Sequence, residues 1–244
     1  MRGLDLKALG LAGRRVLVTG ASRGIGEGVA AAFVAAGARV TILAEDEAVA
    51  ATAARLGAGA DHPVAALRCD VTDAAAVAAA ASGADGLDVL VNNAGMEFQT
   101  RLADAGALAV LERTLAVNVA GMFAITQALL PRLGEGGAII NISTYAAYEP
   151  DHKFPTSGVF RAGLAAFTKL FADQYAADNV RMNNVLPGFI DSLPEQDQFR
   201  ARIPMGRYGR AEEIAATIAF LASEGAGYIT GQNLRVDGGI TRSV

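Results

Sequence analysis

One stretch decides the fold: Thr19-Gly20-Ala21-Ser22-Arg23-Gly24-Ile25-Gly26, which follows an apolar run at residues 14–19 and precedes an alanine-rich run at residues 26–36. Glycines in a turn between a strand and a helix permit tight bends and close approach of the backbone to a bound group. The first N–H groups of the helix and its dipole then face an anion such as a pyrophosphate. The stretch therefore predicts an α/β fold with a dinucleotide site.

The rest of the chain continues this alternation of strand and helix. Apolar, β-branched runs predict seven strands, at residues 14–19, 39–43, 64–70, 87–92, 138–143, 181–186 and 233–236. Their apolar residues are consecutive, which is typical of parallel strands covered on both faces. Helices are predicted at residues 26–36, 47–56, 74–81, 108–133, 162–178 and 211–222. With no linker or repeat, we expect a single Rossmann-like domain over residues 1–244, a seven-stranded parallel sheet with helices on both faces.

Two stretches are predicted to be irregular. Residues 150–156 contain two prolines and mixed charges and read as an exposed loop. Residues 187–204 are the candidate for a mobile lid over a bound substrate.

Composition excludes several classes of function. The 21 Lys and Arg against 25 Asp and Glu are scattered singly, which argues against a nucleic-acid partner. Cys69 has no second cysteine to pair with, and His62 and His152 add too few ligands for a metal site. The charged amino terminus does not resemble a signal peptide, and no apolar run reaches the roughly 18 residues of a membrane span. We therefore expect a cytoplasmic protein without a membrane segment.

Further motifs follow the glycine stretch in a fixed order: Cys69-Asp70-Val71, Asn92-Asn93-Ala94-Gly95, Asn118, Asn141-Ile142-Ser143, Pro187-Gly188, and Gly231-Gln232 ahead of Asp237-Gly238-Gly239. With these motifs the sequence resembles the short-chain dehydrogenase/reductase family almost from end to end. The spacing of the first glycines also matches that family rather than the tighter dinucleotide fingerprint.

The resemblance implies a set of residues that bind a nicotinamide dinucleotide. Those of the glycine turn are Gly20, Ser22, Arg23, Gly24, Ile25 and Gly26. Asp70 and Val71 would frame the adenine, and Asn93, Ala94 and Gly95 would support the ribose and the central strands. Ile190 and Ser192 would hold the carboxamide, and Pro187 and Gly188 would belong to the same cofactor site. Alternatively, Asp70 and Asn93 only cap strand ends, and Pro187-Gly188 is an ordinary turn.

The choice between NAD and NADP depends on two opposing signals. Glu45 and Asp46 follow the second strand, where an acidic side chain accepts hydrogen bonds from the ribose hydroxyls and repels a 2′-phosphate. Arg23 lies in the glycine turn, where relatives that use NADP often carry a basic residue. We expect NAD, with NADP possible.

The catalytic positions depart from the family pattern. The family uses a Tyr as proton donor, a Lys four residues on, a Ser that polarises the substrate oxygen and an Asn that extends a water relay. Asn118 and Ser143 match, but Ser157 stands at the Tyr position and Arg161 at the Lys position. Moving the alignment back by one residue puts Thr156 and Phe160 there instead. Neither alignment restores the pair.

These replacements change the available proton chemistry. A serine hydroxyl titrates far above the range of a tyrosine, whose pKa is about 10. Arg161 keeps its charge and can still bind ribose hydroxyls or an oxyanion, but it does not release a proton. Tyr145, Tyr148 or a water relay through Ser157 are the candidate substitutes.

Three classes of function follow from this pattern. The first is an NAD(P)-dependent oxidoreductase acting on a small alcohol or carbonyl substrate through an atypical proton relay. The second is a catalytically silent protein that senses the dinucleotide or holds a partner, and the third, disfavoured by the glycine turn, is a purely structural protein. Relatives are usually tetramers, and the apolar stretches 108–133 and 162–178 suit a homo-oligomer, either a dimer or a tetramer.

Overall fold

The computed structural model describes residues 5–96, 100–101, 103–152 and 155–243. These residues form a parallel sheet of seven strands in the order β3-β2-β1-β4-β5-β6-β7. The strands are β1 (Arg15–Thr19), β2 (Arg39–Ala44), β3 (Ala65–Arg68), β4 (Leu87–Asn92), β5 (Leu133–Ile142), β6 (Arg181–Pro187) and β7 (Asn233–Val236). The predicted number, order in the sequence and parallel direction of the strands are confirmed.

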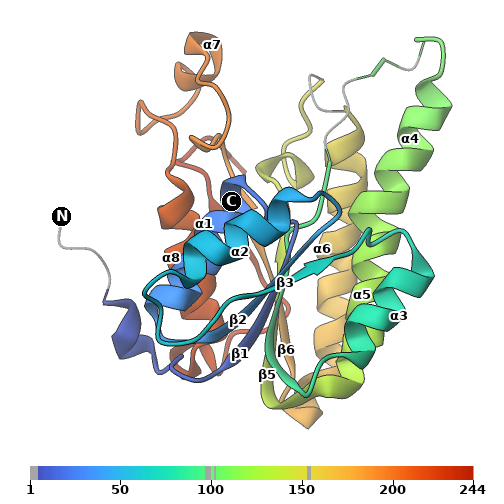
Figure 1. The fold of residues 1–244 in the computed structure, drawn as a ribbon. Coiled ribbons are helices and arrows are strands. Elements are labelled where there is room, and N and C mark those ends of the chain that lie inside the picture. Colours follow the sequence, from blue (N-terminus) through green and yellow to red (C-terminus); the bar gives the residue numbers. More distant parts are fainter. Residues whose placement is uncertain (1–4, 97–99, 102, 153–154, 244) are drawn as a thin grey trace.

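Helices cover both faces of this sheet (Figure 1). The first face carries α1 (Gly24–Ala35), α2 (Ala48–Gly57) and α8 (Ala211–Ala222), and the second carries α3 (Ala74–Ser82), α4 (Ala107–Leu115), α5 (Met122–Leu129) and α6 (Pro155–Tyr175). A short helix, α7 (Asp197–Arg200), stands above the carboxyl edge of the sheet. Single turns of 3₁₀ helix occur at Leu6–Leu9, Leu130–Arg132, Tyr145–Ala147, Ala176–Asp178 and Glu224–Ala226.

Each face of the sheet has its own apolar core. Val16, Val18 and Ile42 point to the side of α1 and α8, whereas Leu17 and Leu90 point to the side of α3 and α5. All five side chains are at most 2% exposed. Successive residues of a strand point to opposite faces, so consecutive apolar residues are what two covered faces require.

The predicted helix 108–133 is wrong as a single element. It divides into α4, a π-helical turn at Ala116–Gly121 and α5, and after one 3₁₀ turn the chain enters β5 at Leu133. The strand predicted at 138–143 accordingly begins earlier. The start of the strand could not be recognised in the sequence because it contains three glycines, Gly134, Gly136 and Gly137. Glycine is depleted in strands, so these residues give no indication of β structure.

The fifth crossover, from β5 to β6, also differs from expectation. α6 begins at Pro155, not at residue 162, because a proline suits the first turn of a helix. Residues 155 and 156 of the predicted loop are therefore helical, while residues 153–154 lie outside the described part of the chain. The helix ends at Tyr175 and a 3₁₀ turn completes the predicted span. β3 is shorter than the predicted 64–70. β4, β7 and α8 match the predicted bounds, and the remaining elements differ at their ends by one or two residues.

A ladder of four asparagines crosses the sheet on neighbouring strands. Asn92, Asn141, Asn184 and Asn233 are in register on β4, β5, β6 and β7. Each amide nitrogen donates to the next oxygen, at 2.9 Å from Asn92 to Asn141, 2.9 Å to Asn184 and 2.7 Å to Asn233. A buried amide must be hydrogen-bonded, so the ladder holds these strands in one register.

The helical run Ala107–Arg132 has the length and apolarity of a membrane span, with a mean hydropathy of 1.5. This differs from the expectation that no run would reach that length. Ile125 and Leu129 are fully buried against the sheet, and the π-helical turn interrupts the run. Core packing therefore accounts for part of its apolarity.

Candidate functional site

The candidate site lies where the carboxyl ends of the strands meet. The chain order reverses between β1 and β4, since β2 and β3 lie on one side of β1 and β4 to β7 on the other. In open α/β sheets this reversal opens a crevice that ligands use. Most of the predicted site residues follow β1, β2, β3, β4, β5 or β6 directly, so the topology brings them to this edge.

The glycine turn leads from β1 into α1 and permits no side chain at two of its positions. A Cβ at Gly20 would lie 2.7 Å from the Cα of Ala94, and one at Gly26 would lie 2.5 Å from the Gly20 oxygen. Gly24 has a φ of 62° and opens α1, where a Cβ would touch only Ser192, at 3.7 Å, among the described residues. Ile25 packs partly against the core. The turn thus presents bare backbone and the first N–H groups of α1 to the crevice.

An acidic side chain from the segment after β2 ties down the glycine turn. Asp46 accepts a hydrogen bond from Ser22 Oγ at 2.9 Å, and its carboxylate lies 3.6 Å from the guanidinium of Arg23. The Arg23 side chain is 81% exposed. Glu45, one residue earlier, is exposed, and its carboxylate makes no hydrogen bond to any described residue. Asp46 therefore offsets the positive charge of Arg23, while Glu45 is left facing solvent.

Asn93 fastens the glycine turn to β4. Its amide nitrogen donates to the carbonyls of Thr19 at 3.0 Å and Gly20 at 2.8 Å. The Thr19 hydroxyl in turn accepts from the backbone N–H groups of Asn93 and Ala94, both at 3.0 Å. These bonds give Asn93 a structural role that does not exclude contact with a ligand.

Asp70 and Val71 follow β3 and are also held by the protein. Asp70 Oδ1 accepts hydrogen bonds from the N–H and the hydroxyl of Thr72, at 2.8 and 2.7 Å, and these bonds hold the pKa of Asp70 below its usual range. Val71 is buried against the π-helical turn, where a Cβ at Gly121 would lie 2.6 Å from its side chain. Asp70 is thus ionised, with a second carboxylate oxygen facing outward.

The segment after β6 closes the site from the other side. A Cβ at Gly188 would lie 2.8 Å from the Cα of Asp237, so β7 requires glycine there. Ile190 is buried in the core and forms a parallel bridge with Gly209, so only its backbone can face a ligand. Ser192 is exposed beside Gly24, and Pro187 ends β6.

The π-helical turn brings Asn118 to the same edge. The Asn118 side chain forms two hydrogen bonds of 2.8 Å with the backbone of Met96, one as acceptor and one as donor. Arg161, on α6, donates from Nη1 to the Ile142 carbonyl at 2.7 Å. A Cβ at Gly95 would lie 2.8 Å from Arg161 Nη2 and 3.1 Å from Asn118 Oδ1. Gly95 is therefore the point at which the β4 segment, the π-helical turn and α6 converge.

Two of the predicted site residues with hydroxyl groups adjoin this point in the chain: Ser143 follows Ile142, and Ser157 precedes Arg161 on α6. The Ser143 hydroxyl is buried and lacks a hydrogen-bond partner among the described residues. Ser157 is half-buried in the first turn of α6, one helical turn before Arg161. Thr156, the alternative in the shifted alignment, is 3% exposed. Arg161, one turn after Ser157, is the α6 side chain that reaches Gly95.

The structure does not bring Tyr145 or Tyr148 to these groups. Tyr145 is 4% exposed, its hydroxyl lies 3.4 Å from Asp151, and burial raises its pKa to about 12. The Tyr148 ring is exposed and lies 5.5 Å from the Arg235 guanidinium carbon. Within the described residues neither phenol contacts Ser143 or Arg161. Both are poorly suited to replace the missing proton donor.

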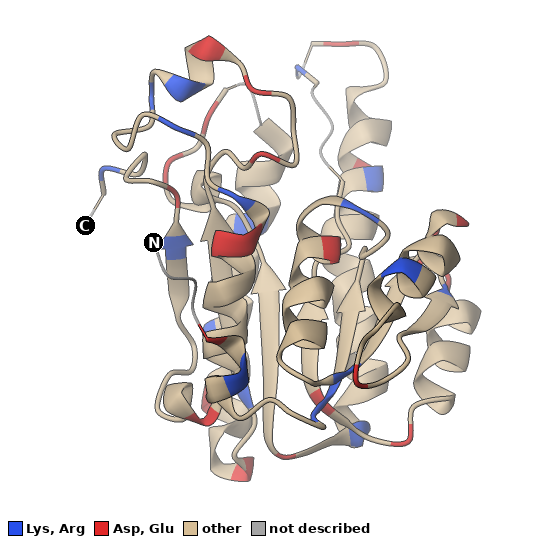
Figure 2. Ribbon diagram, turned by 60° about the vertical axis from the view of Figure 1, so that its left-hand side comes forward, with Lys and Arg blue, Asp and Glu red and all other residues tan. Residues whose placement is uncertain are grey.

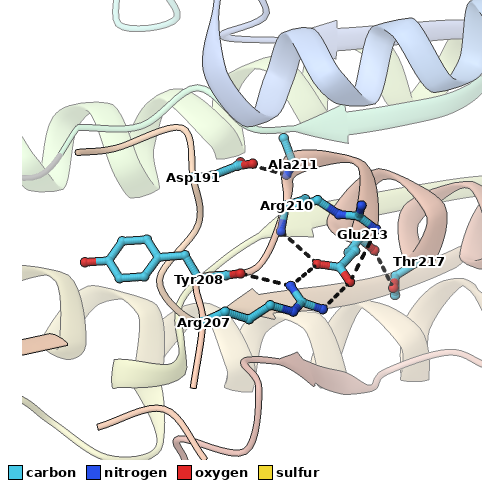
Figure 3. A network of polar contacts seen from close by, with 7 residues as sticks. All are labelled: Asp191, Arg207, Tyr208, Arg210, Ala211, Glu213 and Thr217. Carbon is cyan, nitrogen blue, oxygen red and sulfur yellow. Dashed lines mark hydrogen bonds and ion pairs between the residues drawn. The ribbon is translucent and has the colours of Figure 1, made fainter. Parts of the chain in front are cut away.

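A polar network anchors the segment after β6 to the start of α8 (Figure 3). The Arg207 guanidinium donates two hydrogen bonds, of 2.7 and 2.8 Å, to the Glu213 carboxylate, which also accepts from the Arg210 N–H. These bonds lower the pKa of Glu213 to about 2. Asp191 accepts from the Ala211 N–H at 3.0 Å and so caps α8.

Charges of both signs are mixed along the described part of the chain. Figure 2 shows Lys and Arg interspersed with Asp and Glu along the ribbon. Among the described residues no three His, Cys, Asp or Glu side chains are grouped as metal ligands would be.

Sequence reasoning missed three residues of this edge. Thr19 was quoted as part of the glycine stretch but not recognised as the acceptor for two N–H groups of the β4 segment. Asp151 and Arg202 were missed entirely, although they form an ion pair of 2.6 Å. They lie in two irregular stretches, where no periodic pattern indicates which side chains meet.

Several known proteins are similar to this chain in sequence or in structure. A family model described as enoyl-(acyl carrier protein) reductase matches residues 20–241. D-threitol dehydrogenase of Mycolicibacterium smegmatis is 36% identical over 250 residues, which cover 95% of this chain and 94% of that enzyme. A 3-oxoacyl-[acyl-carrier-protein] reductase of Aquifex aeolicus is 35% identical over 244 residues, 94% of this chain and 98% of that one. A short chain dehydrogenase from Burkholderia cenocepacia in complex with NADP has a TM-score of 0.88 and 34% identity, with 94% and 98% of the chains covered.

Proposed function

Because this chain belongs to the short-chain dehydrogenase/reductase family, we propose that it transfers hydride between a nicotinamide dinucleotide and a small alcohol or carbonyl compound. The bound nicotinamide supplies or accepts the hydride. The observation that carries the proposal is the convergence of Asn118, Ser143 and Arg161 on the edge that also holds the glycine turn.

The glycine turn fits the proposed dinucleotide. Gly20 and Gly26 are packed so tightly that only hydrogen fits in place of a side chain, which keeps the backbone in the shape of a phosphate cradle. Gly24 leaves the amino end of α1 bare. The first N–H groups of that helix have no acceptor within it, so a pyrophosphate would satisfy them.

We favour NAD over NADP on the charges around Arg23. Glu45 is positioned after β2 to accept hydrogen bonds from ribose hydroxyls and would repel a 2′-phosphate. Arg23 could attract that phosphate, but the carboxylate of Asp46 lies 3.6 Å away. The bound NADP is a property of the solved Burkholderia relative. In this chain the negative charges of Glu45 and Asp46 outweigh the partly neutralised charge of Arg23.

The proton must travel without the usual Tyr and Lys. A buried hydroxyl without a partner is costly, so a substrate oxygen that accepts from Ser143 would relieve that cost. The Arg161 guanidinium stays charged at every physiological pH and stabilises negative charge on the same oxygen. Ser157, half-buried in the first turn of α6, would then pass the proton through a water molecule to solvent. We propose this atypical relay in place of Tyr145 or Tyr148.

The proposal is tested by following nicotinamide absorbance with purified protein. Sugar alcohols and 3-oxoacyl thioesters head the substrate panel, since relatives act on those classes. We expect turnover with at least one substrate, faster with NAD than with NADP. Ser143→Ala should lower kcat/KM about ten- to a hundredfold, because it removes one hydrogen bond to the reacting oxygen. Ser82→Ala, on exposed α3, is the matched control.

The second candidate is a catalytically silent protein that binds the dinucleotide, which the replacement of Tyr and Lys favours. Titration calorimetry measures cofactor binding independently of turnover. If the cofactor binds, the wild type is inert on the whole panel, and Ser157→Tyr with Arg161→Lys creates activity, the protein is a silent binder. Turnover by the wild type excludes that function.

Assembly and location complete the proposal. We propose that residues 1–244 act as one domain in a cytoplasmic homo-oligomer, a dimer or a tetramer. Exposed apolar side chains on α4 and α6, including Leu108, Val159 and Leu170, support such an interface. The single cysteine, Cys69, is buried and suits a reducing compartment.

A further inference from the structure

Two irregular segments stand at the carboxyl edge of the sheet beside the proposed site. The first is residues 145–152, between β5 and α6, and we name it the β5 loop. The second is residues 193–203, which follow Ser192 and contain α7, and we name it the α7 segment. Figure 1 shows both rising above this edge of the sheet, α7 at the top of the view.

A nearly buried carboxylate joins the two segments. Asp151 of the β5 loop has a side chain 6% exposed, and its Oδ2 accepts from Arg202 Nη1 of the α7 segment at 2.6 Å. The Tyr145 hydroxyl lies 3.4 Å from the same oxygen. The Arg202 guanidinium carbon is 5.8 Å from the centre of the Phe189 ring. The Arg202 side chain is 39% exposed, and Asp151 Oδ1 also lies 3.7 Å from His152 Nδ1. Removing the arginine still takes its charge away from a carboxylate that is nearly buried, which costs more than breaking an ion pair between two exposed side chains.

Apolar contacts surround this ion pair. Phe199 and Ile203 of the α7 segment pack with Tyr145 of the β5 loop, Tyr208 and Ile240 in one small cluster. Phe189 stacks on Phe199 with ring centres 4.5 Å apart. The ion pair therefore lies at the border of an apolar cluster to which both segments contribute.

Each segment is also fixed at its outer side by separate contacts. The start of the α7 segment follows Ile190, which pairs with Gly209, and Asp191, which caps α8. The β5 loop is held by Glu149, which accepts from the N–H groups of Arg242 and Ser243 at 2.5 and 2.7 Å. Residues 193–198 between these anchors are exposed. The far end of the α7 segment is held by the ion pair with the β5 loop together with the packing of Phe199 and Ile203 in the apolar cluster.

We propose that Asp151 and Arg202 are positioning residues, which hold the α7 segment against the β5 loop and so set the affinity for the substrate. The effect on substrate rests on the proposed function, whereas the holding contact does not. Ser192, beside the glycine turn, is anchored at the opposite end of the α7 segment. Loss of the ion pair therefore weakens substrate binding and leaves cofactor binding intact.

The holding contact is tested by amide hydrogen exchange on the full-length protein. Arg202→Met keeps the length of the side chain but removes its charge, and Arg202→Lys keeps the charge with a smaller donor set. We expect exchange in residues 193–203 to be at least about tenfold faster in Arg202→Met, with an intermediate rate in Arg202→Lys. The matched control is Arg200→Met, because Arg200 pairs only with the exposed Asp197 and Glu195 among the described residues. Unchanged exchange in Arg202→Met, or equal acceleration in Arg200→Met, overturns the proposal.

The effect on substrate is measured with whichever compound the wild type turns over. Arg202→Met should raise KM for that substrate about tenfold, leave kcat within about twofold and leave the cofactor Kd unchanged, and Arg202→Lys should restore part of the loss. A fall in kcat alone, or weaker cofactor binding, overturns the assignment to substrate. If the wild type turns over no compound, the proposed function fails, and the exchange experiment still decides whether Asp151 and Arg202 hold the α7 segment.

Discussion

At the scale of single residues, the geometry of the proposed site depends on the absence of a side chain at Gly95. Among the described residues, a Cβ at this glycine would lie 2.8 Å from Arg161 Nη2 and 3.1 Å from Asn118 Oδ1, so a hydrogen fits there with less crowding than a methyl group. A larger residue there must push aside the end of the Arg161 side chain, which is flexible, and not the backbone. We therefore expect a substitution at Gly95 to lower activity more than stability. We expect the reverse at Gly26, where a Cβ would collide with the Gly20 carbonyl oxygen.

This contrast gives a prediction for Gly95→Ala. Turnover should fall at least about tenfold because Arg161 is displaced, while the free energy of unfolding changes by less than about 1.5 kcal/mol. Steady-state kinetics and urea denaturation measure the two quantities. Gly163→Ala, on the open side of α6, is the control, and it should leave turnover intact and stabilise the helix by about 0.5–1 kcal/mol. Normal activity in Gly95→Ala would show that Arg161 does not serve the reaction.

At the scale of elements, the Glu213 carboxylate stabilises the start of α8 in addition to the cap by Asp191. Glu213 accepts from Arg207 and from the N–H of Arg210, and Figure 3 shows all three groups converging at the first turn. These contacts hold the pKa of Glu213 at about 2, below the ordinary value of 4.5. Because the folded pKa is depressed, the stabilisation is present above pH 4.5 and is lost as the pH falls toward 2.

Glu213→Gln should therefore be less stable than the wild type at neutral pH but not in strong acid. We expect a deficit of about 1–2 kcal/mol at neutral pH, reduced by solvent screening because the pair is partly exposed. The deficit should shrink progressively below pH 4.5. Urea denaturation across this pH range measures it. Glu212→Gln, on an exposed neighbour, is the control, and a deficit independent of pH would mean that the carboxylate charge is not the cause.

Elements that depend on short stretches of sequence could be predicted, and elements that depend on distant contacts could not. Apolar, β-branched runs indicate strands by themselves, and the bounds of β1, β4 and β7 match the predicted ranges to within one residue. The π-helical turn was not predicted, because Ala116–Gly121 has the composition of an ordinary helix and the turn depends on packing against Val71. The early start of α6 at Pro155 was signalled by the proline, yet the mixed charges around it favoured a loop.

For the molecule as a whole, the sequence predicted the proposed cofactor edge better than the substrate side. Glycine turns and strand ends carry short motifs, so the residues from Gly20 to Ser192 could be named in advance. The contact between Asp151 and Arg202 is long-range and lies between two loops, so no motif indicated it. The burial of Tyr145 could not be predicted for the same reason, since Phe189 and Arg202, which lie beside it, come from other parts of the chain.

The exposed apolar residues of α4 and α6 lead to a prediction for the whole assembly. Leu108, Val159 and Leu170 are 67%, 64% and 59% exposed, an arrangement that favours burial against a second copy. Sedimentation equilibrium should give a multiple of 25.0 kDa. Leu170→Glu should shift the distribution to a smaller species, whereas Leu193→Glu, equally exposed on another segment, should not. A monomeric wild type would contradict the proposed homo-oligomer.

The asparagine ladder has a consequence for how the chain is made. Its four amides belong to strands that leave the ribosome one after another, in the same order in which they stand in the sheet. Until β7 emerges, Asn184 has no Asn233 to donate to, and the nascent sheet ends on an open polar edge. Synthesis thus supplies β5, β6 and β7 in turn to the same side of β4. The last of them, β7, completes the row of hydrogen-bonded asparagines.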